Sequence, residues 1–296
     1  MKQRIRDILD GAVDLHVHPS PSPFPRRIGI RQAAEQAAEA GFAAILVKSH
    51  HHSMLSDIAA VESSGGSLPI PVLGGVALNN YVGGLNPVAV ELAVNRGGRI
   101  VWFPTISSDR HICAHSDELR FPHTDDALTV GDAIRVLDED GALVDAAVEV
   151  LDLIAENDLI LSTGHMAPPE VTAVLEAAKA KGITRLLVNH PNFVIEADED
   201  LVRRWIELGA VVEHSLCMYD DRSSFCNWEP DELVRLIDLL GVENTIFGSD
   251  LGQKGNPLPV EGYERVLGDL LDRGVTDEQL RTMVVHNTTR LAGLGA

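Results

Sequence analysis

The sequence VDLHVH occupies residues 13–18, and apolar and polar side chains alternate along it. Successive side chains of a β-strand point to opposite faces, so the apolar residues would share one face. Asp14, His16 and His18 would then share the other. We expect the apolar face to pack against helices, which leaves the two histidines facing the inside of the fold.

Similar short apolar runs recur along the chain, each followed by an amphipathic helical pattern and about one strand-plus-helix unit from the next. Buried strands that alternate with helices favour a parallel sheet with a covered outer face. Eight such units predict an α/β fold, a (β/α)8 TIM barrel, as a single domain over residues 1–296. The expected strands are Val13–His18, Ala43–His50, Pro71–Asn79, Arg99–Thr105, Leu159–His165, Arg185–Pro191, Ala210–Leu216 and Thr245–Leu251.

Four of the intervening helices have clear boundaries. We expect them at 31–40, 168–181, 231–240 and 277–289; glycines follow the first three and Pro168 opens the second. The connection between the fourth and fifth strands is about twice the usual length. It predicts a long loop over 106–125, then a β-hairpin turning at Asp140-Gly141. Long loops are often functional, so this loop is a candidate lid. Each of its histidines, at positions 111, 115 and 123, is by itself more typical of an exposed polar loop.

The composition excludes several classes of protein. Of 296 residues, 45% are hydrophobic, and the formal net charge is −20 with no block of basic residues to offset it. Nucleic acid and anionic membranes would therefore be repelled. No segment approaches the ~20 apolar residues of a membrane span. The three cysteines form no CxxC pair and the N-terminus has no signal-peptide core, so we expect a cytoplasmic protein. A small-molecule substrate and a homo-oligomer are the partners we expect.

Unusual polar residues stand where five expected strands end. These endings are His16-Val17-His18, Lys48-Ser49-His50, Gly164-His165, Asn189-His190 and Ser249-Asp250. One histidine on a strand is usually a satisfied core or rim residue. Here the first, second, fifth and sixth strands bring histidines to one rim and the eighth brings a carboxylate. Burying these polar groups is costly unless something pairs them.

A divalent cation would pair these groups at once. We predict a metal site formed by His16, His18, His165 and Asp250, at the strand ends where barrel enzymes carry their catalytic residues. The ion we expect is Zn²⁺, with Mn²⁺ or Fe²⁺ as alternatives. Because no cysteine contributes, the site is of the catalytic type, with room for a water that the metal activates.

Several segments resemble the amidohydrolase superfamily. The matching pieces, in chain order, are DLHVH at 14–18, STGHM at 162–166, VNHP at 188–191, FGSD at 247–250 and VHNTTRLAGL at 285–294. The HxHPSP motif that starts at His16 suggests a poorly characterised branch. The resemblance implies that His16, His18 and His165 are metal ligands, and that Asp250 is both a ligand and the proton shuttle. It also implies that His190 orients the attacking water, polarises the substrate or binds a second metal.

One departure from the superfamily concerns the second metal. Binuclear members carry a carboxylated lysine or a glutamate at the end of the fourth strand, whereas this strand ends Trp102-Phe103-Pro104-Thr105. Lys48 stands at the end of the second strand instead. We favour contact with a substrate anion or water for Lys48. The alternatives are a rim lysine paired to an acid, or a carboxylated lysine that bridges two metals with help from His50. One ion is therefore favoured and two are possible.

Further substrate contacts come from other strand ends and loops. His50 and His214 are candidates, although His214 could equally hydrogen-bond a metal ligand. Arg26 and Arg27 follow a proline-rich loop and could bind a carboxylate, but exposed surface positions are the favoured interpretation.

We predict a hydrolase that uses a metal-activated water to cleave an amide, cyclic imide, lactone or ester bond of a small molecule, with Asp250 and His190 as its catalytic residues. Two alternatives remain open. One is a metal-dependent, non-oxidative decarboxylase of the same superfamily. The other is a catalytically inactive barrel that acts as a binding protein.

Overall fold

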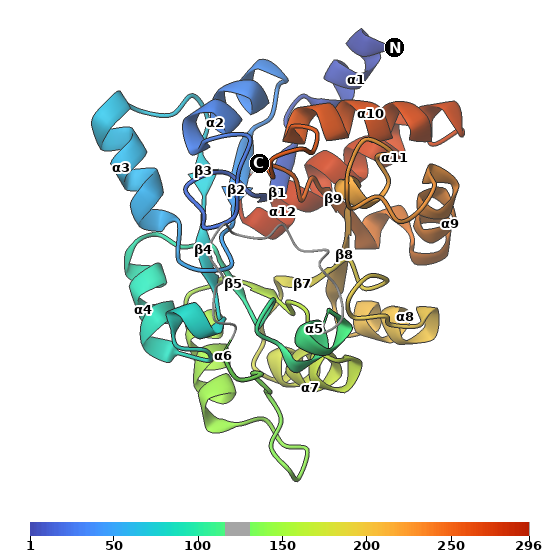
Figure 1. Ribbon diagram of the computed structural model, residues 1–296. Coiled ribbons are helices and arrows are strands. Elements are labelled where there is room, and N and C mark those ends of the chain that lie inside the picture. Colours follow the sequence, from blue (N-terminus) through green and yellow to red (C-terminus); the bar gives the residue numbers. More distant parts are fainter. Residues whose placement is uncertain (116–130, 296) are drawn as a thin grey trace. The chain divides into compact units, whose positions relative to one another are not determined.

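The computed structural model describes residues 1–115 and 131–295, so His123 and much of the expected loop over 106–125 lie outside the described residues. All eight expected strands are present (Figure 1). Gly74 divides the third into β3 (Val72–Leu73) and β4 (Gly75–Ala77). The chain divides into two compact units. Unit 1 holds residues 1–48, 56–73 and the chain from 213 onward, and unit 2 holds 49–55 and 74–212. The prediction of a single domain stays a prediction.

The sheet of unit 1 is parallel and is built around β1 (Val13–Val17). On one side β1 pairs with β2 (Ala44–Val47), which pairs with β3. On the other side, β1 meets the end of β9 (Thr245–Gly248) and the residues after it, because the N–H of His18 donates to the Leu251 carbonyl at 2.8 Å. The second half of β8 (Ala210–Ser215) also belongs to this unit. The carboxyl end of β1 is thus held beside that of β9.

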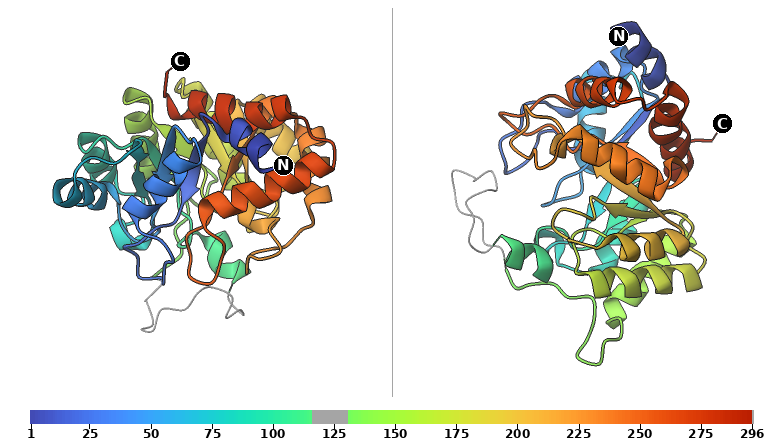
Figure 2. Two further views of the ribbon diagram at one scale, coloured as in Figure 1. Left: turned by 90° about the horizontal axis from the view of Figure 1, so that it is seen from above. Right: turned by 90° about the vertical axis from the view of Figure 1, so that its right-hand side faces the viewer.

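Helices cover the outer face of this sheet. They are α1 (Lys2–Leu9), α2 (Ile30–Glu39), α3 (Leu55–Gly65), α9 (Pro230–Leu240), α10 (Pro259–Asp272), α11 (Asp277–Arg281) and α12 (Asn287–Ala292). Figure 2 shows α1 against α10. Short turns lie at η2 (Leu216–Met218) and η3 (Val242–Asn244), and a π-helix, η4 (Thr282–His286), interrupts the expected terminal helix. The Asn287 amide donates to the carbonyls of Val242 and Thr245, which ties this helix to the start of β9.

In unit 2, β4, β5 (Ile100–Trp102), β6 (Ile160–Ser162) and β7 (Leu186–Asn189) pair in that order, all parallel. Its helical segments are η1 (Asn80–Val82), α4 (Pro87–Asn95), α5 (Asp109–Ala114), α6 (Asp145–Glu156), α7 (Pro168–Ala180) and α8 (Glu199–Glu207). Neighbouring α4, α6 and α7 pack side by side along the sheet (Figure 1). Proline begins α4 and α7, at the position where a missing N–H costs nothing.

The expected hairpin is present in a minimal form. Leu137 and Leu143 form an isolated antiparallel bridge, and the N–H of Asp138 donates to the Ala142 carbonyl at 2.9 Å. Gly141 has φ +80°, the left-handed conformation that such a turn needs. None of the described helices combines the length and the apolar character needed to cross a lipid bilayer.

Candidate metal centre

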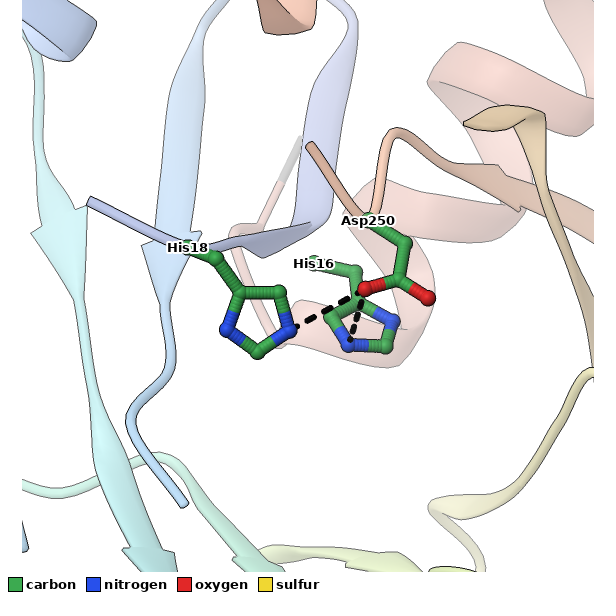
Figure 3. A group of neighbouring side chains, drawn as sticks. All are labelled: His16, His18 and Asp250. Atoms are coloured by element: carbon green, nitrogen blue, oxygen red, sulfur yellow. Dashed lines mark ion pairs between the residues drawn. The ribbon is translucent and has the colours of Figure 1, made fainter. Parts of the chain in front are cut away.

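Three of the predicted ligands converge in unit 1, where β1 and β9 end (Figure 3). The Nε2 atoms of His16 and His18 lie 3.4 and 3.0 Å from Oδ1 of Asp250. One ligand atom from each residue lies within 4.8 Å of the other two. Both histidines are buried, and the Asp250 side chain is 15% exposed. The three ligand atoms therefore lie close enough together to share one metal ion.

The backbone holds Asp250 in an unusual conformation. Its φ is +52°, a left-handed value that is uncommon for a residue with a side chain. Its N–H donates to the His16 carbonyl at 2.7 Å, and the Gln253 side chain donates to its carbonyl at 2.9 Å. The Ser249 hydroxyl also donates to the His16 carbonyl. Several hydrogen bonds thus fix the residue that must meet both histidines, as is common for strained residues at functional sites.

Glu213 on β8 orients His16, and the sequence analysis missed it. Nδ1 of His16 donates to Oε1 of Glu213 at 2.6 Å, and the Ser215 hydroxyl donates to the same oxygen at 3.1 Å. Glu213 is fully buried. Gly248 provides the necessary space, because a Cβ there would lie 2.8 Å from both the His16 Cβ and the Glu213 Cδ. The carboxylate keeps the proton on Nδ1 and leaves Nε2 to face Asp250, as in metal sites.

His18 is held in the same tautomer by a different acceptor. Its Nδ1 donates to the Lys48 carbonyl at 3.0 Å, so its Nε2 is the atom turned towards Asp250. Burial lowers the pKa of His18 to about 3, although the nearby Asp250 carboxylate opposes this shift. The imidazole is therefore neutral at physiological pH, which is the form that binds a metal ion.

Two further buried ionisable groups adjoin this cluster. Nζ of Lys48 lies 3.1 Å from Nε2 of His16, and burial lowers the pKa of Lys48 to about 8 against the opposing charges of Asp250 and Glu213. Asp14 accepts the backbone N–H groups of His16 and Ser249, each at 3.0 Å. Burial raises its pKa to about 7.

The other predicted strand-end histidines belong to unit 2. His165 follows β6, and its ring centroid lies 4.9 Å from that of His190, which follows β7. His190 also has a positive φ, +29°. Nδ1 of His50 lies 2.8 Å from the Thr105 hydroxyl. The remaining candidate, His214, is a buried residue of unit 1.

The sequence-based expectation for His111 is wrong, because this residue is buried rather than exposed. Its Nδ1 lies 2.8 Å from Nδ1 of His165. Ser108 explains the placement: its hydroxyl accepts the His111 N–H, which caps α5, and donates to the His165 carbonyl at 2.7 Å. One serine therefore attaches the start of the long connection to His165.

Comparisons with known proteins support the fold. A family model described as "Family of unknown function (DUF6282)" matches residues 11–213. No curated protein sequence matches the chain. Solved structures of amidohydrolase-superfamily enzymes do. An amidohydrolase from Pseudomonas aeruginosa aligns with TM-score 0.60 and 10% identity over 98% of this chain and 97% of that one. The probable dipeptidase PvdM from the same organism aligns with TM-score 0.63 and 12% identity over 99% of this chain and 97% of that one.

A third match is a putative 2-pyrone-4,6-dicarboxylic acid hydrolase from Pseudomonas putida, with TM-score 0.57 and 12% identity over 97% of this chain and 98% of that one. At such low identity the likeness establishes the fold alone. The predicted α/β TIM-barrel class is thereby confirmed.

Proposed function

The chain belongs to DUF6282, a family of unknown function, and we propose that it is a metal-dependent hydrolase of a small-molecule substrate. The observation that carries this proposal is the convergence of His16, His18 and Asp250, with the Nδ1 atom of each histidine engaged elsewhere. The structures that share the fold include proteins named as an amidohydrolase, a probable dipeptidase and a putative 2-pyrone-4,6-dicarboxylic acid hydrolase, which supports hydrolysis as the reaction type.

The donor set fits a divalent cation. Two imidazoles and one carboxylate are typical ligands of Zn²⁺, and they also suit Mn²⁺ and Fe²⁺. Because Nδ1 of each histidine donates elsewhere, both Nε2 atoms are turned towards the Asp250 carboxylate, at 3.4 Å for His16 and 3.0 Å for His18. A divalent cation could bind all three groups at once. We therefore propose that His16, His18 and Asp250 bind one metal ion, and Zn²⁺ is the ion we favour. The ligand role of His165 and the catalytic role of His190 stay predictions.

A bound divalent cation supplies Lewis acidity, which makes water more acidic and a carbonyl carbon more electrophilic. The remaining chemistry belongs to the chain. Asp250 is the most accessible of the three ligands, so its carboxylate can take a proton from the attacking water and return it to the leaving atom. Proton transfer of this kind contributes roughly 10²–10⁴-fold. Glu213 keeps His16 in one orientation throughout, because both groups are buried and hydrogen-bonded.

Elemental analysis and an activity screen test this proposal together. Purified protein should contain a divalent metal, and it should hydrolyse at least one member of a panel of amides, cyclic imides, lactones and esters. Asp250→Asn should lower that rate by about 100-fold or more while most of the metal stays bound. The exposed Asp200→Asn is the matched control and should leave the rate unchanged.

Labelled water identifies the reaction type. Hydrolysis in ¹⁸O-water must place the label in the product, whereas a decarboxylation would release CO₂ with no net consumption of water. Protein that neither contains nor binds metal, or full activity in Asp250→Asn, would overturn the proposal. His165→Asn extends the test, since a ligand at that position predicts a weaker metal affinity in the variant.

A further inference from the structure

The segment that follows β1 is fastened to the loop that follows Asp250. Arg26 and Gln253 form an antiparallel bridge. On either side, the Arg27 N–H donates to the Gly252 carbonyl at 2.8 Å, and the Lys254 N–H donates to the Pro25 carbonyl at 3.0 Å. Gln253 in turn donates its side-chain amide to the Asp250 carbonyl. Gln253 therefore links the backbone of Arg26 to that of Asp250, the candidate metal ligand.

Arg26 does not behave as the exposed arginine that the sequence favoured. Its side chain is half-buried, and its Nε is fully buried with no hydrogen-bond partner in the described part of the chain. Its guanidinium carbon lies 5.9 Å from the centre of the Phe24 ring. Arg27 provides the contrast, because its exposed guanidinium bonds to the Glu261 carboxylate and the Asn256 carbonyl. Leaving a buried guanidinium donor unsatisfied is costly, so a ligand that satisfies it is favoured.

The charge of Arg26 acts on the metal cluster itself. Burial lowers the pKa of Arg26 to about 10, and the Asp250 carboxylate opposes that shift. Arg26 also helps to lower the pKa of His18. Arg26 therefore remains positively charged at physiological pH and is close enough to influence two of the three candidate ligands. Although the net charge of the chain is −20, Arg26 therefore provides a local positive charge beside the metal cluster.

We propose that Arg26 binds a carboxylate group of the substrate, which makes the substrate a small organic acid. A planar guanidinium matches a carboxylate geometrically and can donate two hydrogen bonds to it, and such charge-assisted bonds are among the strongest in proteins. The buried Nζ of Lys48 adds a second positive charge beside His16. This inference rests on the proposed function in one respect: the reacting bond of the same acid lies at the metal cluster.

Calorimetric titration of the metal-loaded protein tests the proposal without a known substrate. The probes are acetate, malonate, succinate and glutarate, each compared with its neutral amide, together with inorganic phosphate. At least one of the acids should bind the wild-type protein at millimolar concentration. Arg26→Gln should raise its dissociation constant by about 10- to 100-fold, because a charge-assisted hydrogen-bonding partner is lost. The dissociation constant of Arg26→Lys should lie between those of the wild type and Arg26→Gln, and that of Arg27→Gln should equal the wild-type value.

Three results would overturn the assignment. One is that Arg26→Gln binds every acid as tightly as the wild type does, which includes the case in which no acid binds either protein. Another is that phosphate binds more tightly than every carboxylate with the same dependence on Arg26, since the recognised group would then be a phosphate. The third is that Arg26→Gln loses its metal, because Arg26 would then support the metal cluster instead. Metal is measured in the same samples. A metal-free wild type that binds acids through Arg26 supports this inference and overturns the proposed function.

Discussion

Replacing Glu213 by glutamine isolates the contribution of one buried charge to the candidate metal centre. The amide keeps the size of the side chain and an oxygen that can accept the proton of His16 Nδ1, which now lies 2.6 Å from a carboxylate oxygen. What the variant loses is the negative charge, and with it part of the basicity of His16 Nε2. Loss of such a partner typically weakens metal affinity by about 10- to 100-fold. That is a free energy of about 1.4 to 2.8 kcal/mol.

The assay is competition for Zn²⁺ between the protein and a chromophoric chelator of known affinity at constant pH. Ser215→Ala is the matched control, because Ser215 donates to the same Glu213 oxygen at 3.1 Å but does not touch His16. We expect a much smaller change in this control than in Glu213→Gln. Equal Zn²⁺ affinity in Glu213→Gln and in the wild type, with both proteins folded, would refute the role assigned to Glu213.

Three further predictions concern residues near the candidate ligands. Gly248→Ala places a Cβ 2.8 Å from atoms of both His16 and Glu213, so chelator competition should show weakened Zn²⁺ binding. Gly268→Ala in α10 is the control: its Cβ meets its nearest atom at 3.7 Å, and the variant should bind Zn²⁺ as the wild type does. If Gly248→Ala binds Zn²⁺ as tightly as the wild type, the side chains around position 248 can make room for the added methyl group, and the reasoning fails. His111→Ala removes the partner of His165 Nδ1 and should lower the free energy of unfolding, measured in urea, by about 1–3 kcal/mol; no measurable loss would contradict the hydrogen bond as described. Burial raises the pKa of Asp14 from 3.8 to about 7, so the unfolded chain releases this proton at a lower pH than the folded protein does. The free energy of unfolding of the metal-free protein should therefore fall as pH rises between these two pKa values. Asp14→Asn should remove this part of the loss, and parallel stability profiles for the two proteins would exclude the shift.

The parts of the fold that the sequence predicted are those set by local patterns. Alternation along 13–18 is a covalent property of an extended chain, so it placed His16 and His18 on one face before any packing was known. Glycine and proline at helix ends likewise act within one turn, and they marked α2, α7 and α9 to within a residue or two. The terminal helix was predicted as continuous, but packing places the π-helix η4 within it.

Tertiary structure alone decided which distant groups meet. Glu213 and His16 are 197 residues apart, and no local pattern links a glutamate on one strand to a histidine on another. The signal that the sequence did offer was a glutamate within the apolar run that forms β8. Burial of His111 depended on Ser108 bonding to the His165 backbone, and that of Arg26 on a bridge to Gln253. Sequence patterns could determine the residue types and their local faces, whereas side-chain burial, tautomer and charge state depend on neighbours that only the folded chain supplies.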